Sequence, residues 1–450
     1  MASHSAVSAR RLRALATPGQ SRAFATLGQL RAFATLGQLR ACAALAAVLS
    51  GAPSAVAFDG IQFGPVGPGA GGGTDTSSRE FIKEYEVNPE KGTATLSKGN
   101  IAATKAAVKR YSDIVAQGGW PTVPNIEIQP GQASYAIAML RDRLKASGEY
   151  KGDTSKSETY DGELQEAVKR YQSSNGLTPT GIVDKRTIAA LNVPAEGRLK
   201  QLKVNVDRLT QASSGTAKKY VMVNIPAAQI EAVENGHVVD RYAGVVGKPD
   251  RPTPLLRTAI YEMNFNPVWR LPPTVISKDL IPRGREMQAS GKNVLVKFGI
   301  DAFDGSGKKL NPEAINWSSG QPAALSYSQK PGKDNPLGFL KINFANAHSV
   351  YMHDTPKNSI FGRNFRADSS GCVRVSGIDR LALWILAPQG WSSGHVEQMK
   401  ESGERKDVKV KKPVALYFIY VTAWATADGS VHFRRDLYNR DGVGEIAGAY

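Results

Sequence analysis

The chain is 450 residues long, and its 57 Lys and Arg against 40 Asp and Glu give a formal net charge of +17. This length suits two or three domains, and the basic bias favours an anionic polymer, a membrane surface or nucleic acid as a partner. Because one of the two cysteines, Cys42, lies in a predicted export signal, the exported chain keeps a single thiol and cannot form an intramolecular disulfide.

Residues 1–57 have the pattern of a signal peptide. They contain six arginines and no acidic residue, followed by the apolar stretch Ala41–Leu49 and the small-x-small cleavage pattern Ala55-Val56-Ala57. The apolar stretch is too short to cross a bilayer, so we expect a soluble exported protein and not an anchored one. Removing six arginines leaves 17 − 6 = +11 on the exported chain, and export makes nucleic acid the weakest of the three partners.

Two segments separate this signal from the first domain. Residues 58–79 are rich in Gly and Pro and lack the apolar content of a core, which predicts a linker. Residues 80–129 are predicted to be an N-terminal helical segment, with Ile101, Val108 and Ile114 as buried positions.

Residues 130–193 predict a compact unit of three short helices. Apolar residues recur at helical spacing in two stripes, formed by Ile137, Leu140 and Leu144 and by Leu164, Ala167, Val168 and Tyr171. The run from Asp161-Gly162 through Asn175-Gly176-Leu177 to Thr187 resembles the peptidoglycan-binding domain of many wall enzymes. The alternative is a small bundle that serves only as a spacer, since the same residues would form its core. Residues 194–217 are expected to be a connector.

From residue 218 to 450 the pattern changes to strands. Gln229–Glu234 and His237–Val246 flank Asn235-Gly236, a strong hairpin signal, and Val414–Ala425 and Ser430–Arg434 flank Asp428-Gly429. Strands without alternating helices predict a mainly antiparallel sheet or barrel, interrupted by one helix at Gly377–Leu386. The chain is therefore expected to be an α+β multidomain protein.

Cys372 lies in the run Ser369-Ser370-Gly371-Cys372-Val373-Arg374-Val375. Small residues before it and an arginine after it favour an accessible, electropositive setting, in which a thiolate forms more readily. A buried, unreactive thiol is the alternative.

A cysteine nucleophile needs a base, and His353 is the best candidate. It is predicted to stand at the end of an apolar strand, 372 − 353 = 19 residues before Cys372. The other histidines of the exported chain are expected to be solvated surface residues: His237, His348, His395 and His432. No second ligand pair has a suitable spacing for a metal site, and no cofactor is implied.

The segments His353-Asp354-Thr355-Pro356 and Ser369–Val375 together resemble the signature of the L,D-transpeptidases, bacterial enzymes that crosslink peptidoglycan. Further matching segments are Val246-Gly247-Lys248, Asn266-Pro267-Val268-Trp269, Leu337-Gly338 with Lys341, and Tyr438-Asn439. This version is similar to the large Gram-negative subfamily that carries a peptidoglycan-binding domain and an insertion capping the active site. Many members have a histidine where this chain has Ser370.

The resemblance implies roles for several residues. Cys372 would be the nucleophile and His353 its general base and acid. Charge on the tetrahedral oxygen also needs donors, and the backbone N–H groups of Gly371 and Cys372, with support from Ser370, are the candidates because glycine permits close approach. Arg374 would bind a substrate carboxylate, or else form a structural ion pair. Residues 270–336 would be the substrate cap.

The resemblance also implies the reaction and its setting. The expected activity is peptidoglycan crosslinking through a thioester on tetrapeptide stems, in the periplasm, with an outer-membrane lipoprotein as another acceptor and carbapenems as inhibitors. Three alternatives stay open: an L,D-carboxypeptidase or hydrolase with the same residues, a non-catalytic peptidoglycan binder, and an unrelated cysteine protease. The absence of a papain-like Cys-Trp context counts against the last.

Overall fold

The computed structural model describes residues 94–152 and 158–443. The predicted signal peptide, the linker 58–79 and the start of the 80–129 segment lie outside the described residues, and all described residues belong to one unit, 58–450. Within this part of the chain, no helix combines the length and the apolar character needed to span a membrane.

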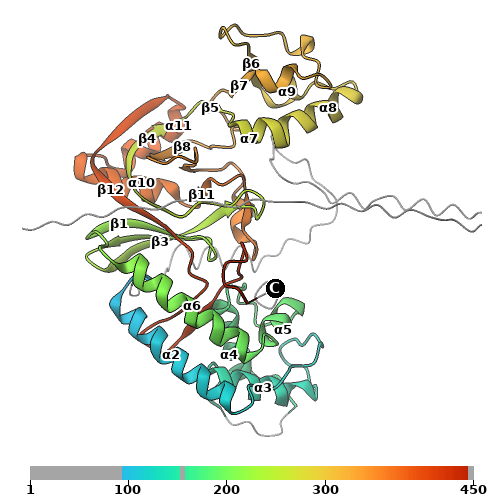
Figure 1. Cartoon of the computed structure of the whole chain (residues 1–450), viewed down its shortest axis with the longest axis vertical. Helices are drawn as coiled ribbons and strands as arrows, with labels where there is room; N and C mark the ends of the chain where they lie inside the picture. The colour runs from blue at the N-terminus through green and yellow to red at the C-terminus, as the bar shows by residue number, and fades with distance from the viewer. Residues whose placement is uncertain (1–93, 153–157, 444–450) are drawn as a thin grey trace, which may run out of the picture. The chain divides into compact units, whose positions relative to one another are not determined.

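Two long helices, α2 (Lys98–Ala116) and α6 (Ala195–Ser213), pack side by side (Figure 1). The Ser97 side chain accepts a hydrogen bond from Asn100 N and so caps α2. Residues 194–217, expected to be a plain connector, are therefore largely helical.

The three apolar positions predicted to be buried on α2 pack against the cores, but they lie beside the most buried face of the helix and not at its centre. Ile101, Val108 and Ile114 are only partly buried, and the fully buried positions are Asn100, Thr104, Ala107 and Tyr111. Two of these are polar, and their hydrogen bonds explain the burial. Asn100 Nδ2 donates to the carbonyl of Ala94, and Thr104 Oγ1 accepts from the backbone of Ala425.

The small helical unit contains the three predicted helices: α3 (Ala136–Ser147), α4 (Gly162–Ser174) and α5 (Lys185–Leu191). Asp161 and Asp184 cap α4 and α5 by accepting hydrogen bonds from backbone N–H groups three residues ahead. All residues of the two predicted apolar stripes are buried in one shared core, which confirms the helical spacing read from the sequence.

Nine strands form one sheet in the order β10-β3-β11-β9-β8-β4-β12-β1-β2. Because β2 also pairs with β3, the sheet closes on itself as a barrel. The strands are β1 (Lys219–Asn224), β2 (Gln229–Glu234), β3 (His237–Gly247), β4 (Leu256–Phe265), β8 (Leu340–Phe344), β9 (Met352–His353), β10 (Ala367–Ser369), β11 (Val373–Val375) and β12 (Lys406–Ile419).

Most strand pairs are antiparallel, as expected, and the β2–β3 hairpin turns at Asn235 and Gly236, both with positive φ. Three pairs are parallel: β1 with β12, β3 with β10, and β9 with β11. Parallel neighbours need long connections, and the chain between β9 and β11 provides one.

The second hairpin differs from the prediction of a strand from Val414 to Ala425. The barrel strand β12 ends at Ile419, and β13 (Ala423–Ala425) pairs with β14 (Val431–Phe433) in a separate two-stranded sheet. The chain leaves the barrel because the N–H of Thr422 donates to Asn205 Oδ1 on α6 instead of to a neighbouring strand.

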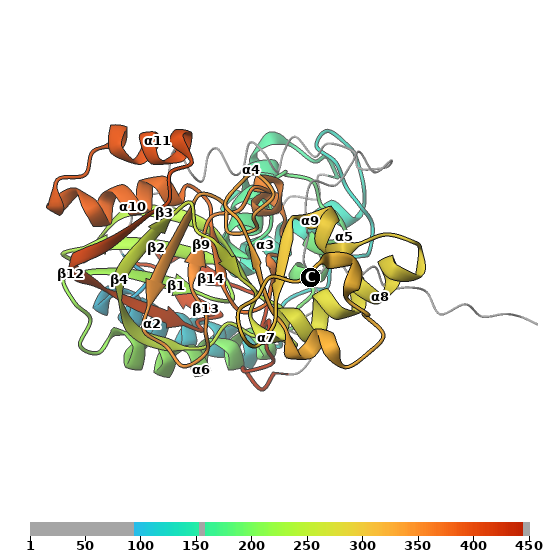
Figure 2. The same cartoon turned by 90° about the horizontal axis from the view of Figure 1, so that it is seen from above.

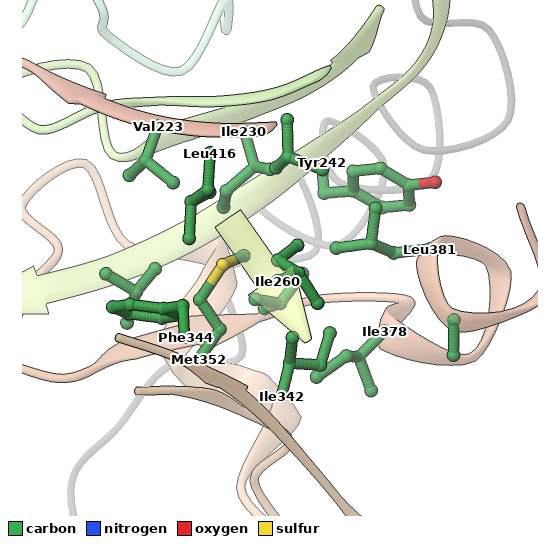
Figure 3. Close-up of a cluster of buried hydrophobic side chains, with 14 of the residues drawn as sticks. Val223, Ile230, Tyr242, Ile260, Ile342, Phe344, Met352, Ile378, Leu381 and Leu416 are labelled. Carbon is green, nitrogen blue, oxygen red and sulfur yellow. The ribbon is translucent and has the colours of Figure 1, made fainter. Parts of the chain in front are cut away.

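Two helices lie side by side against the barrel, α10 (Ile378–Leu386) and α11 (Ser393–Ser402) (Figure 2). The first was predicted, but α11 was missed because it is mostly polar. Its N-cap Ser392 forms a capping box with His395, and a histidine in place of the usual Glu or Gln left no clear signal in the sequence. Side chains of α10 join those of the strands in the main core (Figure 3), which includes Val223, Ile230, Tyr242, Ile260, Ile342, Phe344, Met352, Ile378, Leu381 and Leu416.

The predicted capping insertion, residues 270–336, has a core of its own that includes Trp317, Leu280 and Tyr327. Its helices α7, η1 and α8 are consecutive in the chain, and α9 follows after a short turn. Its three strands form a small sheet in the order β5-β7-β6 (Figure 1). The elements are β5 (Trp269–Arg270), α7 (Pro273–Val275), the π-helix η1 (Ile276–Leu280), α8 (Ile281–Ala289), α9 (Val294–Phe298), β6 (Ile300–Phe303) and β7 (Ser326–Gln329), with 3₁₀ turns at Pro312–Ala314 and Gln321–Ala324.

Candidate active site

The alternation of side chains along β9 and β11 separates the core from the candidate site. Met352, Val373 and Val375 point into the main core. Because neighbouring side chains of a strand point to opposite faces, His353 and Arg374 lie on the other face, where the parallel register places them opposite each other. His353 is the last residue of β9, which confirms its predicted position at a strand end.

Two further residues share this face and were missed as site residues. Lys341 of β8 lies opposite His353 in the antiparallel register. Its ammonium sits 4.4 Å from the ring centroid of Tyr351, and the Tyr351 ring contacts the His353 ring edge-to-face at 5.6 Å between centroids. The signal for Tyr351 was its spacing, because a residue two positions before His353 on an extended chain shares its face.

The Cys372 thiol is partly buried and un-ionised. Burial raises its pKa to about 11, although hydrogen bonds from Tyr351 and the charges of Lys341 and Arg374 act in the opposite direction. The predicted electropositive setting is therefore present, but desolvation outweighs it. At neutral pH the resting side chain is a thiol.

The His353 ring is also neutral. Burial, and then the charge of Arg374, lowers its pKa to about 3, against the opposing effect of the Asp354 carbonyl. Its Nδ1 lies 2.6 Å from that carbonyl oxygen. Since a carbonyl only accepts, Nδ1 carries the hydrogen, which leaves the lone pair on Nε2. A neutral imidazole with this tautomer can accept a proton at Nε2.

The nucleophile loop, residues 369–372, is held by its own hydrogen bonds. Ser369 Oγ accepts from Gly371 N at 3.1 Å and donates to the Cys372 carbonyl at 2.5 Å, and Thr253 Oγ1 donates to the Gly371 carbonyl at 2.9 Å. Gly371 has φ 110°, a conformation that L side chains rarely adopt. Of the two expected oxyanion donors, the Gly371 N–H is already engaged, so the Cys372 N–H is the better candidate.

Ser370 and Arg374 occupy different settings. The Ser370 hydroxyl accepts a hydrogen bond from Arg251 Nη1 at 2.9 Å. Arg374 is placed next to the site, and its Nε is buried without a hydrogen-bond partner among the described residues. The carboxylate with the largest electrostatic effect on Arg374 is that of Asp368. Asp368 forms its ion pair with Lys248 instead, at 3.3 Å between Nζ and Oδ1. These observations favour a ligand role for Arg374 over a structural ion pair.

One of the four histidines expected on the surface is not a surface residue. His237, His348 and His395 are exposed, as predicted. His432 is partly buried and stacks on Trp424 at 5.0 Å between ring centroids, and burial lowers its pKa to about 3. His432 of β14 lies directly opposite Trp424 of β13 in the antiparallel register, so both rings are on the same face of this small sheet. The polar sequence neighbours of His432 did not reveal this pairing.

Two segments of the chain match known domain families. Residues 218–414 match the family described as the L,D-transpeptidase catalytic domain, and residues 134–191 match the one described as "Putative peptidoglycan binding domain". A protein of Haemophilus influenzae named "Putative L,D-transpeptidase" is 29% identical over 221 residues. That match covers 49% of this chain and 44% of the relative, so the chain spans less than half the length of this relative.

Solved structures also match. The L,D-transpeptidase of Xylanimonas cellulosilytica is 16% identical with a TM-score of 0.22, and the match covers 66% of this chain and 99% of that one. The L,D-transpeptidase of Stackebrandtia nassauensis is 14% identical with a TM-score of 0.27, covering 66% and 96% of the two chains.

Proposed function

Because residues 218–414 match an L,D-transpeptidase catalytic domain and residues 134–191 match a peptidoglycan-binding domain, we propose that the protein is a cysteine-dependent L,D-transpeptidase acting on peptidoglycan stem peptides. The observation that carries this proposal is the arrangement on one sheet face, where the nucleophile loop adjoins the strand that ends in His353. The proposed location is the periplasm, on the signal-peptide pattern of residues 1–57.

The proposed chemistry begins from two neutral side chains. Cys372 Sγ attacks the carbonyl carbon of the third stem residue as its proton passes to His353 Nε2, and the carbonyl oxygen becomes an oxyanion near the Cys372 N–H. The bond to the terminal D-alanine then breaks, and His353 returns the proton to the leaving nitrogen. The product is a thioester on Cys372.

The second half-reaction replaces sulfur with nitrogen. An amine of a neighbouring stem attacks the thioester carbonyl and loses a proton to His353, and the Cys372 sulfur leaves and regains its proton. A crosslink forms and the free enzyme returns. An amine from a lipoprotein lysine would give wall attachment through the same step, and water would give a shortened stem.

The Arg374 guanidinium supports recognition of an anionic stem. Its Nε is buried without a partner among the described residues, and an unpaired buried donor is costly unless a ligand satisfies it. A carboxylate of the stem peptide is the matching acceptor, since a guanidinium binds carboxylates through two parallel hydrogen bonds.

A large groove supports the binding of a polymer. It has a volume of about 3000 Å³ and is lined by residues of the peptidoglycan-binding domain such as Arg186, by Arg363 and Phe365, and by Asp354 and Thr355 directly after His353. Exposed cationic and aromatic side chains suit an anionic, sugar-containing strand. Arg186→Glu with Arg363→Glu should weaken sedimentation with purified sacculi in a salt-dependent way. Unchanged sedimentation of the folded variant would exclude the groove as the binding surface.

Activity is tested by incubating the protein with disaccharide-tetrapeptides and analysing the products by mass spectrometry. Crosslinked dimers that disappear in Cys372→Ala would support the proposal, while tripeptide products alone would indicate an L,D-carboxypeptidase. No turnover by the folded protein would refute both. A carbapenem provides an independent check, because its adduct should map to Cys372.

A further inference from the structure

Arg251 connects three segments that are distant in the sequence. Its Nη1 donates to Asp279 Oδ2 at 2.5 Å and its Nη2 donates to Asp279 Oδ1 at 3.1 Å, a bidentate pair with the capping insertion. The same Nη1 donates to Ser370 Oγ in the nucleophile loop at 2.9 Å. One guanidinium therefore joins the cap to the residue two positions before Cys372.

The Arg251–Asp279 pair is shielded from water, unlike a second ion pair on the same insertion. The side chains of Arg251 and Asp279 are 4% and 7% exposed, whereas those of Arg283 and Glu286 are 43% and 67% exposed. Exposed pairs contribute little, but removing one partner of a buried pair leaves an uncompensated charge. The buried pair thus constrains its surroundings far more than the exposed one.

Both ends of the link are in unusual local structure. Asp279 lies in the π-helix η1 between α7 and α8, and π turns occur often at functional sites. Ser370 precedes Gly371, whose backbone is in a conformation that other residues rarely adopt. The segment around Arg251 also holds the backbone of the nucleophile loop, because Lys248 N donates to the Ser369 carbonyl at 2.9 Å.

We propose that Arg251 and Asp279 are positioning residues, which clamp the nucleophile loop to the capping insertion through Ser370 and so hold Cys372 in its reactive place. This inference rests on the proposed function, and it gives Ser370 a structural purpose of its own. The contact of the Arg251 guanidinium with the nucleophile loop is made through the Ser370 hydroxyl. The planar guanidinium can bind the Asp279 carboxylate through two hydrogen bonds and the Ser370 hydroxyl at the same time. A lysine ammonium cannot reproduce this geometry.

The test is Asp279→Asn, which keeps the size of the side chain and removes its charge. Because a misplacement of about 1 Å costs on the order of 100-fold in rate, we expect a fall in kcat of at least about 10-fold with KM little changed. Asp279→Glu, which restores the carboxylate, should recover part of the lost kcat. Glu286→Gln, which breaks the exposed pair of the same insertion, is the matched control and should keep the wild-type values.

A second readout does not depend on turnover. Alkylation of Cys372 by iodoacetamide at fixed pH should become several-fold faster in Asp279→Asn, because the released loop exposes the thiol. Ser370→Ala removes only the hydroxyl acceptor and should change both readouts in the same direction, which covers the case in which Asp279→Asn fails to fold. If kcat and alkylation both match wild type in the folded variants, the clamp is refuted. A wild-type protein without turnover would refute the proposed function alone, since alkylation would still test the clamp.

Discussion

The ionisation of Cys372 allows a quantitative prediction. Burial raises its pKa from 9.0 to about 11, and two pKa units correspond to about 100-fold less thiolate at any pH below both values. Only the thiolate reacts with iodoacetamide. Alkylation of the folded protein at pH 7.5 should therefore be about 100-fold slower than that of an unperturbed thiol, and should rise about tenfold per pH unit until near pH 11.

The assay follows carboxamidomethylation by mass spectrometry between pH 6 and pH 11, with peptide mapping to separate Cys372 from Cys42. Urea-unfolded protein provides the unperturbed reference. His353→Gln is the informative variant: since the resting ring is already neutral above about pH 4, its replacement should leave the alkylation profile unchanged. A rate that levels off at or below pH 9, or an alkylation profile that shifts upward in His353→Gln, would show a thiolate–imidazolium pair and refute the neutral resting state.

Two more predictions concern packing. Thr253→Val should lower the free energy of unfolding by about 1–3 kcal/mol, measured by denaturant titration, because it leaves Gly247 N and the Gly371 carbonyl without their buried partner; an unchanged midpoint would contradict this. Gly284→Ala should destabilise the capping insertion, since the added Cβ would lie 2.2 Å from the Trp317 ring. Faster proteolysis within residues 270–336 would confirm the effect, and wild-type resistance would contradict it.

Local signals in the sequence were sufficient where a short run of residues determines the geometry. Asn235-Gly236 adopts positive φ at both positions and so dictates the β2–β3 turn. The apolar spacing of α3 and α4 likewise predicts their buried faces, because the small domain has a single core. The position of His353 at the end of β9 followed from its apolar neighbours.

Long-range polar contacts could not be predicted in this way. Thr104 is buried on α2 because its hydroxyl accepts a hydrogen bond from Ala425, and no periodicity reveals a partner 321 residues away. The Arg251–Asp279 pair was hidden for the same reason. For Cys372 the charge of Arg374 was anticipated, but the burial that raises the pKa of the thiol comes from the folded chain around it and has no local signal in the sequence.

The parallel pairing of β1 with β12 has a consequence for how the chain folds. Tyr220 pairs with Ala415, so the barrel cannot close until nearly the whole of residues 218–419 is available to fold. The pairings of β1 with β2 and of β2 with β3 are local and are expected to form first. Until β12 arrives, the outer edge of β1 is then left without a partner strand. Folding of this protein is therefore expected to be slow, with its greatest exposure to aggregation before the last barrel strand arrives.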